Sequence, residues 1–123
     1  MPKLKIVRKY KVEEPIAYDK GVKIGENSTI GPYTVIGRET VIGKNVRIKD
    51  SVIFPETVIS DFASIENTII GEKVFIGKKV KIGKGCIIGD HVKIKDHVSI
   101  ANNVSICPAK EITENVLEPT CII

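Results

Sequence analysis

The chain has 123 residues and a formal net charge of +4, which suits one domain and favours anionic ligands such as phosphates without indicating a nucleic-acid surface. No apolar run reaches the roughly 18 residues of a membrane span, and the basic N-terminus lacks the apolar stretch of a secretory signal. The three cysteines are too few and too scattered for a disulfide framework or a zinc cluster, so we expect a cytoplasmic protein that binds no nucleic acid, membrane or metal.

Aliphatic residues branched at Cβ dominate the apolar part of the composition, with 22 Ile and 14 Val against two Leu. Branching at Cβ favours strands and disfavours helices, so the composition predicts an all-β protein. Lys and Glu are also abundant, a bias that is seen in proteins from hot environments and that an AT-rich genome produces as well.

Residues 1–15 precede the periodic part of the chain. Their segment LKIVRKYKV alternates charged with apolar residues and carries several basic side chains. An open coil of strands leaves unpaired backbone groups at its edge, and a charged strand is one way to protect them. We therefore expect residues 1–15 to form an N-terminal cap or linker strand.

From residue 16 to residue 107 the sequence repeats with a period of six. A smaller residue lies two positions before each Ile-Gly aliphatic, and side chains two apart on a strand point the same way. Each unit thus predicts a short strand with two inward residues and a turn at the glycine, where positive φ is allowed. Three strands per coil give a triangular parallel β-solenoid of about five coils over residues 16–107. The Ile-Gly pairs are Ile24-Gly25, Ile30-Gly31, Ile36-Gly37, Ile42-Gly43, Ile70-Gly71, Ile76-Gly77, Ile82-Gly83 and Ile88-Gly89.

The phase of the repeat slips between Gly43 and Gly71, which are two residues closer than five full units would place them. We place the loss in ETVISDFASIENTIIG, as two units of five residues with Val58, Ala63 and Thr68 pointing inward. One coil is then tighter than its neighbours.

The outward residues of this pattern separate by face. One face is polar, whereas the other two carry apolar columns that would form continuous stripes at the spacing of neighbouring strands. Contiguous exposed apolar stripes mark interfaces, so we predict a homo-oligomer, a trimer about a three-fold axis, with packing against another domain as the alternative. The polar face carries Thr29, Arg47, Ser64, Lys81 and Ser99; the predicted interface residues are Val35, Ile53, Ile69 and Ile87 on one apolar face and Val41, Ile59 and Phe75 on the other.

Residues 108–123 leave the hexapeptide phase. Pro108 lacks the backbone N–H that a ladder needs, and AKEITENVL has a pattern that allows a helical turn over the last coil. We expect these residues to form a C-terminal cap.

The stretch SVIFPETVISDFASIENTIIGEKVFIGKKVKI, with its shortened coil, resembles the C-terminal domain of sugar-phosphate nucleotidyltransferases of the mannose-1-phosphate guanylyltransferase type. The opening EEPIAYDKGVKIGENSTIGPYTVIG and the ending VSICPAKEITENVLEPTCII resemble the start and the tail of the same domain, so the resemblance covers essentially the whole chain. It implies a single-stranded left-handed parallel β-helix that serves assembly or regulation in nucleotide-sugar biosynthesis.

Those enzymes begin with a nucleotide-binding catalytic domain that has a Gly-rich loop, and nothing in this sequence matches it. The segment before the first coil is too short for such a domain. We therefore expect the chain to be inactive in nucleotidyl transfer by itself, to need no cofactor, and to have a sugar-phosphate nucleotidyltransferase catalytic domain as a possible partner.

Two other activities are known for hexapeptide solenoids. Zinc carbonic anhydrases of this fold need three histidine ligands, and this chain has two histidines. The alternative that remains is an acetyl-CoA-dependent acyltransferase acting on an amino sugar or a sugar nucleotide. In that case His91 or His97 would be the catalytic base, and a lysine group would meet the pyrophosphate of the cofactor: Lys78, Lys79, Lys81 and Lys84. The histidines are also explained as exposed residues of surface turns, and the lysines as side chains that keep the solenoid soluble.

Overall fold

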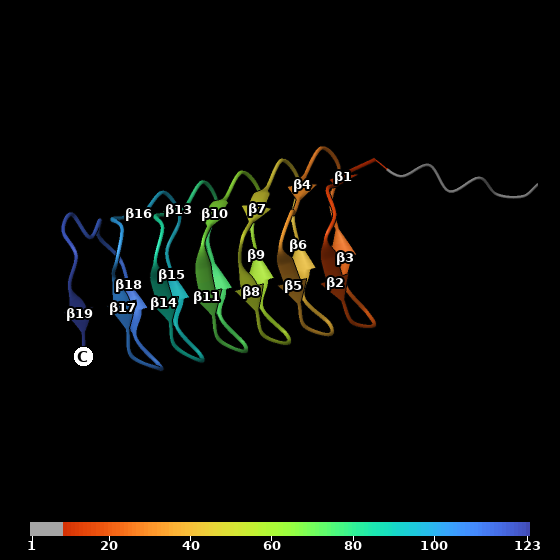
Figure 1. Ribbon diagram of the computed structural model, residues 1–123. Helices are drawn as coiled ribbons and strands as arrows, with labels where there is room; N and C mark the ends of the chain where they lie inside the picture. Colours follow the sequence, from red (N-terminus) through yellow and green to blue (C-terminus); the bar gives the residue numbers. More distant parts are fainter. Residues whose placement is uncertain (1–8) are drawn as a thin grey trace, which may run out of the picture.

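A computed structural model describes residues 9–123 and shows a parallel β-helix of about six coils stacked along one axis (Figure 1). The strands form three parallel sheets, which we name faces A, B and C. Face A contains β1 (Lys11–Val12), β4 (Thr29–Ile30), β7 (Arg47–Lys49), β10 (Ser64–Glu66), β13 (Lys81–Ile82) and β16 (Ser99–Ile100). Face B contains β2 (Ile16–Tyr18), β5 (Thr34–Ile36), β8 (Val52–Ile53), β11 (Thr68–Ile70), β14 (Cys86–Ile88), β17 (Ser105–Ile106) and β19 (Cys121–Ile122). Face C contains β3 (Lys23–Ile24), β6 (Val41–Ile42), β9 (Val58–Ile59), β12 (Phe75–Ile76), β15 (Lys93–Ile94) and β18 (Glu111–Ile112).

The core is a ladder of inward aliphatic side chains, one layer per coil, which confirms the predicted solenoid. The aliphatic that ends each unit points inward, as at Ile30, Ile48 and Ile65 on face A, where the register pairs them directly. Full burial of one such side chain contributes roughly 1.5–3 kcal/mol. Because each coil contacts only the adjacent coils, the free energy of unfolding is approximately a sum of contributions from the individual coils and their contacts.

Hydroxyl groups occupy several inward positions and close the turns. Thr57 Oγ1 donates to the carbonyl of Gly71 at 2.9 Å and accepts from the backbone nitrogen of Val74 at 3.3 Å. Ser28 Oγ makes the same pair of bonds with Gly43 and Val46. Each of these hydroxyls is paired with a backbone carbonyl and a backbone nitrogen of the next coil, so it is buried without leaving an unpaired polar group.

Two corners of the β-helix are one residue short, and their position corrects the predicted register. One lies between β7 and β8 at Asp50, and the other lies between β10 and β11 at Asn67, so both connect face A to face B. The sequence analysis placed both losses after Glu56. The first loss comes earlier, so the strands β8 and β9 shift by one residue and their side chains exchange sides.

Ile53 and Ile59 were therefore wrongly predicted to point outward. Both are 1% exposed and belong to the core, whereas Val52 and Val58 are each 37% exposed and take their places in the outward columns. Their strand partners agree, because Val52 pairs with Val35 and Ile69 on face B, and Val58 pairs with its neighbours on face C.

The parallel ladders extend beyond residues 16–107 at both ends. The strand β1 pairs with β4. Of residues 1–15, predicted to form an N-terminal cap or linker strand, residues 1–8 lie outside the described part. At the other end β18 pairs with β15, and β19 pairs with β17. The predicted helical turn is wrong, since Glu111–Ile112 is a strand and Val116 forms a parallel bridge with Ile100. Within residues 9–123 no helix is long and apolar enough to cross a membrane.

Candidate functional site

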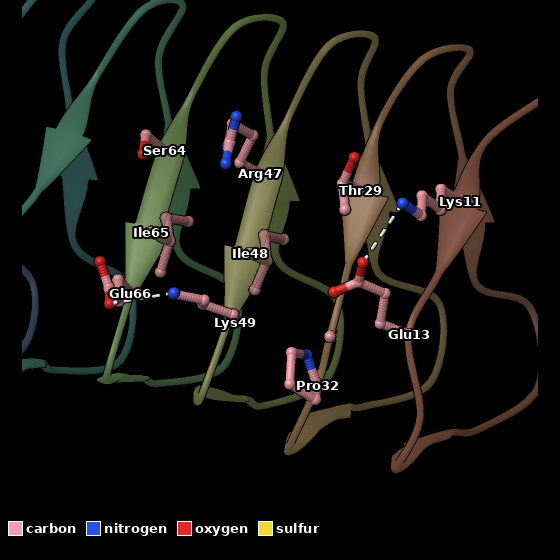
Figure 2. Close-up of a pocket in the computed structure, with 11 residues that line it drawn as sticks. Lys11, Glu13, Thr29, Pro32, Arg47, Ile48, Lys49, Ser64, Ile65 and Glu66 are labelled. Carbon is pink, nitrogen blue, oxygen red and sulfur yellow. Dashed lines mark ion pairs between the residues drawn. The ribbon is translucent and has the colours of Figure 1, made fainter.

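A polar trough runs along face A. Two hollows form it, one of about 600 Å³ over β1, β4, β7 and β10 and one of about 310 Å³ over β10, β13 and β16, and they meet at Ser64 and Glu66. Figure 2 shows the larger hollow, with Arg47 lying toward Ser64 and with Lys49 and Glu66 at the edge nearer the corner to face B. The charged residues of the trough are Lys11, Glu13, Arg47, Lys49, Glu66, Lys81 and Lys84.

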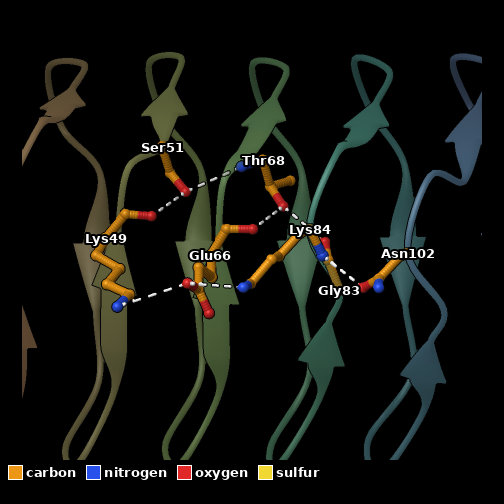
Figure 3. A network of polar contacts seen from close by, with 7 residues as sticks. All are labelled: Lys49, Ser51, Glu66, Thr68, Gly83, Lys84 and Asn102. Atoms are coloured by element: carbon orange, nitrogen blue, oxygen red, sulfur yellow. Dashed lines mark hydrogen bonds and ion pairs between the residues drawn. The ribbon is translucent and has the colours of Figure 1, made fainter.

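The carboxylates of the trough are already paired. Glu66 lies between two lysines, 3.5 Å from Lys49 Nζ and 3.7 Å from Lys84 Nζ (Figure 3). Glu13 pairs with Lys11 at 3.3 Å. The trough has five cations against two carboxylates. Arg47 and Lys81 have no ion pair with a residue of the described chain, so the excess positive charge of the trough lies at these two side chains.

Faces B and C carry the apolar surface, which continues around the corner between them. On face B the outward column pairs strand by strand, and Ile69 at its centre is 46% exposed. Phe54, which the sequence analysis missed, is 46% exposed at the corner where β8 leaves face B for face C. We define the apolar surface as Val35, Val52, Ile69 and Ile87 on face B, Val41, Val58 and Phe75 on face C, and Phe54 between them.

The two histidines lie in one coil but at different corners. His91 forms the turn from face B to face C, and His97 forms the turn from face C to face A. Both are exposed, both have positive φ, and each backbone nitrogen donates to the preceding coil, to Glu72 and Lys78 respectively. They occupy the repeating turn position of the solenoid and do not share a pocket.

The lysine group proposed for a cofactor is also spread out. Lys81 and Lys84 line the smaller hollow of the trough, and Lys84 is held by Glu66. Lys78 and Lys79 lie at the corner between faces C and A and do not line that hollow.

Among the described residues no group of three or more His, Cys, Asp or Glu could hold a metal ion. Burial raises the pKa of the Cys86 thiol, whose Sγ donates to the carbonyl of Ala101.

A family model described as the GMPPB C-terminal domain matches residues 12–122. The chain belongs to this family. The match spans nearly every coil and confirms the resemblance that the shortened coil and the tail had indicated. A search of curated proteins by sequence found no match.

Solved structures similar to this GMPPB C-terminal domain include β-helix acyltransferases. The acetyltransferase domain of PglB from Neisseria gonorrhoeae FA1090 in complex with acetyl coenzyme A has a TM-score of 0.63 and 14% identity, covering 88% of this chain and 51% of that chain. LpxA, a UDP-N-acetylglucosamine acyltransferase from Bacteroides fragilis 9343, has a TM-score of 0.55 and 16% identity, covering 88% and 55%. The chain thus spans about half the length of these proteins, and the likeness establishes the left-handed β-helix fold.

Sequence reasoning recovered face A of this family domain only in part. Face A was predicted to be polar, but the trough and its ion pairs were not, since Lys49 and Glu66 are third residues of β7 and β10 that the six-residue pattern assigns to turns. No glycine follows Ile48 or Ile65, but none follows Ile94 or Ile100 either, where the strands end, so the local sequence carries no signal that singles out Lys49 and Glu66.

Proposed function

We propose that this β-helix is the assembly domain of a sugar-phosphate nucleotidyltransferase in nucleotide-sugar biosynthesis and acts without a cofactor of its own. The observation that carries this proposal is the apolar surface on two adjoining faces of a chain that belongs to the GMPPB C-terminal domain family. A catalytic domain, whether on the same polypeptide or on another, supplies nucleotide binding and transfer.

The distribution of apolar side chains supports subunit contacts through faces B and C. Four successive strands on face B and three on face C expose branched or aromatic side chains, whereas the column on face A alternates cations with hydroxyls. Leaving apolar area in water costs roughly 25 cal/mol per Å². Closed symmetry covers such stripes without leaving an open end, and two adjoining stripes facing a three-fold axis give a homotrimer.

Replacing Ile69 by Lys should dissociate this assembly, because a charge buried without a partner is costly. Light scattering should report three times the chain mass of 13.5 kDa for the native protein and a single-chain mass for Ile69→Lys. Ser99→Lys places the same side chain on an outward position of face A and should leave the mass unchanged. A native chain that stays monomeric at micromolar concentration, or an assembled Ile69→Lys, would refute the proposed interface.

Acyl transfer from acetyl-CoA to an amino sugar or sugar nucleotide is the second candidate function, and the likeness to the PglB domain that contains acetyl coenzyme A favours it. His91 or His97 would then act as base, and a groove between subunits would have to bring it to the cofactor. Because the two histidines lie at separate exposed corners, we expect no acetyl transfer from acetyl-CoA to an amino sugar or sugar nucleotide, and the same affinity for acetyl-CoA in His91→Ala and His97→Ala as in the native chain.

An acyltransferase would give a different result in the same experiments. General-base catalysis supplies about 10²–10⁴-fold in rate. Micromolar binding of acetyl-CoA, together with a loss of transfer of that size in His91→Ala or His97→Ala, would establish the acyltransferase in place of the assembly domain.

A further inference from the structure

Two cations of the polar trough, Arg47 and Lys81, face each other across one strand. Arg47 of β7 pairs with Ser64 of β10, and Ser64 pairs with Lys81 of β13. With neighbouring strands about 4.8 Å apart, the Cα atoms of the two cations lie roughly 10 Å apart. Both side chains are long and flexible, so their charged groups can converge above the Ser64 hydroxyl.

The surroundings leave this position open to an anion. The two hollows of the trough meet at Ser64, which is half-buried, and Figure 2 shows the Arg47 guanidinium directed to the Ser64 side of its strand. The carboxylate that lines both hollows, Glu66, is shared between Lys49 and Lys84 and does not pair with either Arg47 or Lys81. An anion here meets two uncompensated cations and a hydroxyl donor.

We propose that Arg47, Ser64 and Lys81 form a binding site for the diphosphate group of a small molecule. A guanidinium donates two parallel hydrogen bonds to one phosphoryl group, an ammonium neutralises a second, and the hydroxyl donates between them. The spacing of two cations across one strand suits two linked phosphoryl groups better than a single phosphate. The proposal is independent of the apolar surface, because the trough lies on the face that the assembly leaves in solvent.

Calorimetry with inorganic pyrophosphate at physiological ionic strength tests the site. We expect saturable binding of one pyrophosphate per chain, and a loss of about tenfold in affinity for Arg47→Gln and for Lys81→Gln, the size expected for one hydrogen bond to a charged group. Lys93→Gln is the matched control, because Lys93 is the exposed outward residue of β15 in the same coil as Lys81 but on face C. Its affinity should remain that of the native chain.

Inorganic phosphate is the second probe, because it reaches one cation at a time and should bind about tenfold more weakly than pyrophosphate. Equal affinity for the two probes, absence of saturation with pyrophosphate, or an equal loss in Lys93→Gln would overturn the proposal. Backbone amide shifts in NMR spectra should change around residues 47, 64 and 81 and not along β15. All three substituted residues are exposed, and unchanged circular dichroism shows that the variants fold.

This outcome is separable from the assembly test. Light scattering reports the apolar surface, whereas pyrophosphate binding reports face A. A monomer that binds pyrophosphate refutes the assembly domain and supports the site, and a trimer that does not bind it does the reverse.

Discussion

Replacing Ile59 by Ala should lower the free energy of unfolding by about 2–5 kcal/mol, the range for a large aliphatic removed from a packed core. Ile59 ends β9, is 1% exposed, and stacks between Ile42 and Ile76 in the inward column of face C. Loss of its side chain leaves a cavity that the coils above and below cannot fill, because their backbones are fixed by parallel ladders. Urea-induced unfolding at one protein concentration, followed by circular dichroism, measures the change.

Val58→Ala is the matched control and decides the register. Val58 precedes Ile59 on the same strand but points outward, so in the Ile69→Lys background, where the subunit contact is lost, its truncation should change the unfolding free energy by less than about 1 kcal/mol. The phase that the six-residue repeat predicts across this coil has the two residues the other way round. A larger loss for Val58→Ala than for Ile59→Ala would therefore restore that phase and contradict the structure.

The fold was predictable because one local rule repeats through most of the chain. With two inward residues and a turn every six positions, the apolar side chains can be buried in few ways. The shared period also indicates which strands pair with each other, which a sequence without repeats does not show. The register across the slip was not predictable from the same rule. Where Asp50 follows Lys49 without a glycine, the sequence does not mark which residue the turn omits, and a one-residue error exchanges the two sides of each strand.

The residues of the candidate sites were predictable where the six-residue repeat alone determines which way a side chain points. Ile69, Ile87 and Phe75 lie in phase beyond the slip and were placed on the correct faces, whereas Phe54 sits at a corner, outside the pattern. The trough depends on side-chain pairing across coils, such as Glu66 with Lys84, which are 18 residues apart. Periodicity shows that such residues are neighbours but does not show which pairs are neutralised, so it could not single out Arg47 and Lys81.

The glycines of the repeat have a different role from the predicted one. Of the eight glycines in Ile-Gly pairs, Gly31 alone has the predicted positive φ (φ 101), and in each corner a left-handed residue comes two positions after the glycine, as Lys79 (φ 60) does after Gly77. At Gly77 an added Cβ would lie 2.6 Å from the backbone nitrogen of Asp96 and 2.8 Å from the carbonyl carbon of Lys95 in the next coil. The close approach lets Asp96 Oδ1 accept a hydrogen bond from the backbone nitrogen of Lys78 at 2.8 Å. Gly43, Gly71 and Gly83 face an Asp or Asn of the next coil in the same way.

Gly77→Ala should therefore destabilise the protein by about 1–3 kcal/mol, the cost of forcing an extra carbon into packed backbone. Lys79→Gly, which removes a Cβ from a left-handed residue in the same corner, should change the unfolding free energy by no more than about 1 kcal/mol. Gly77→Asn separates the two explanations, because Asn tolerates positive φ but also carries a Cβ. If close approach is the reason for glycine, Gly77→Asn should unfold at a urea concentration no higher than Gly77→Ala does. Recovery of native stability in Gly77→Asn would show instead that backbone conformation selects the glycine, and that the neighbouring coil can move aside.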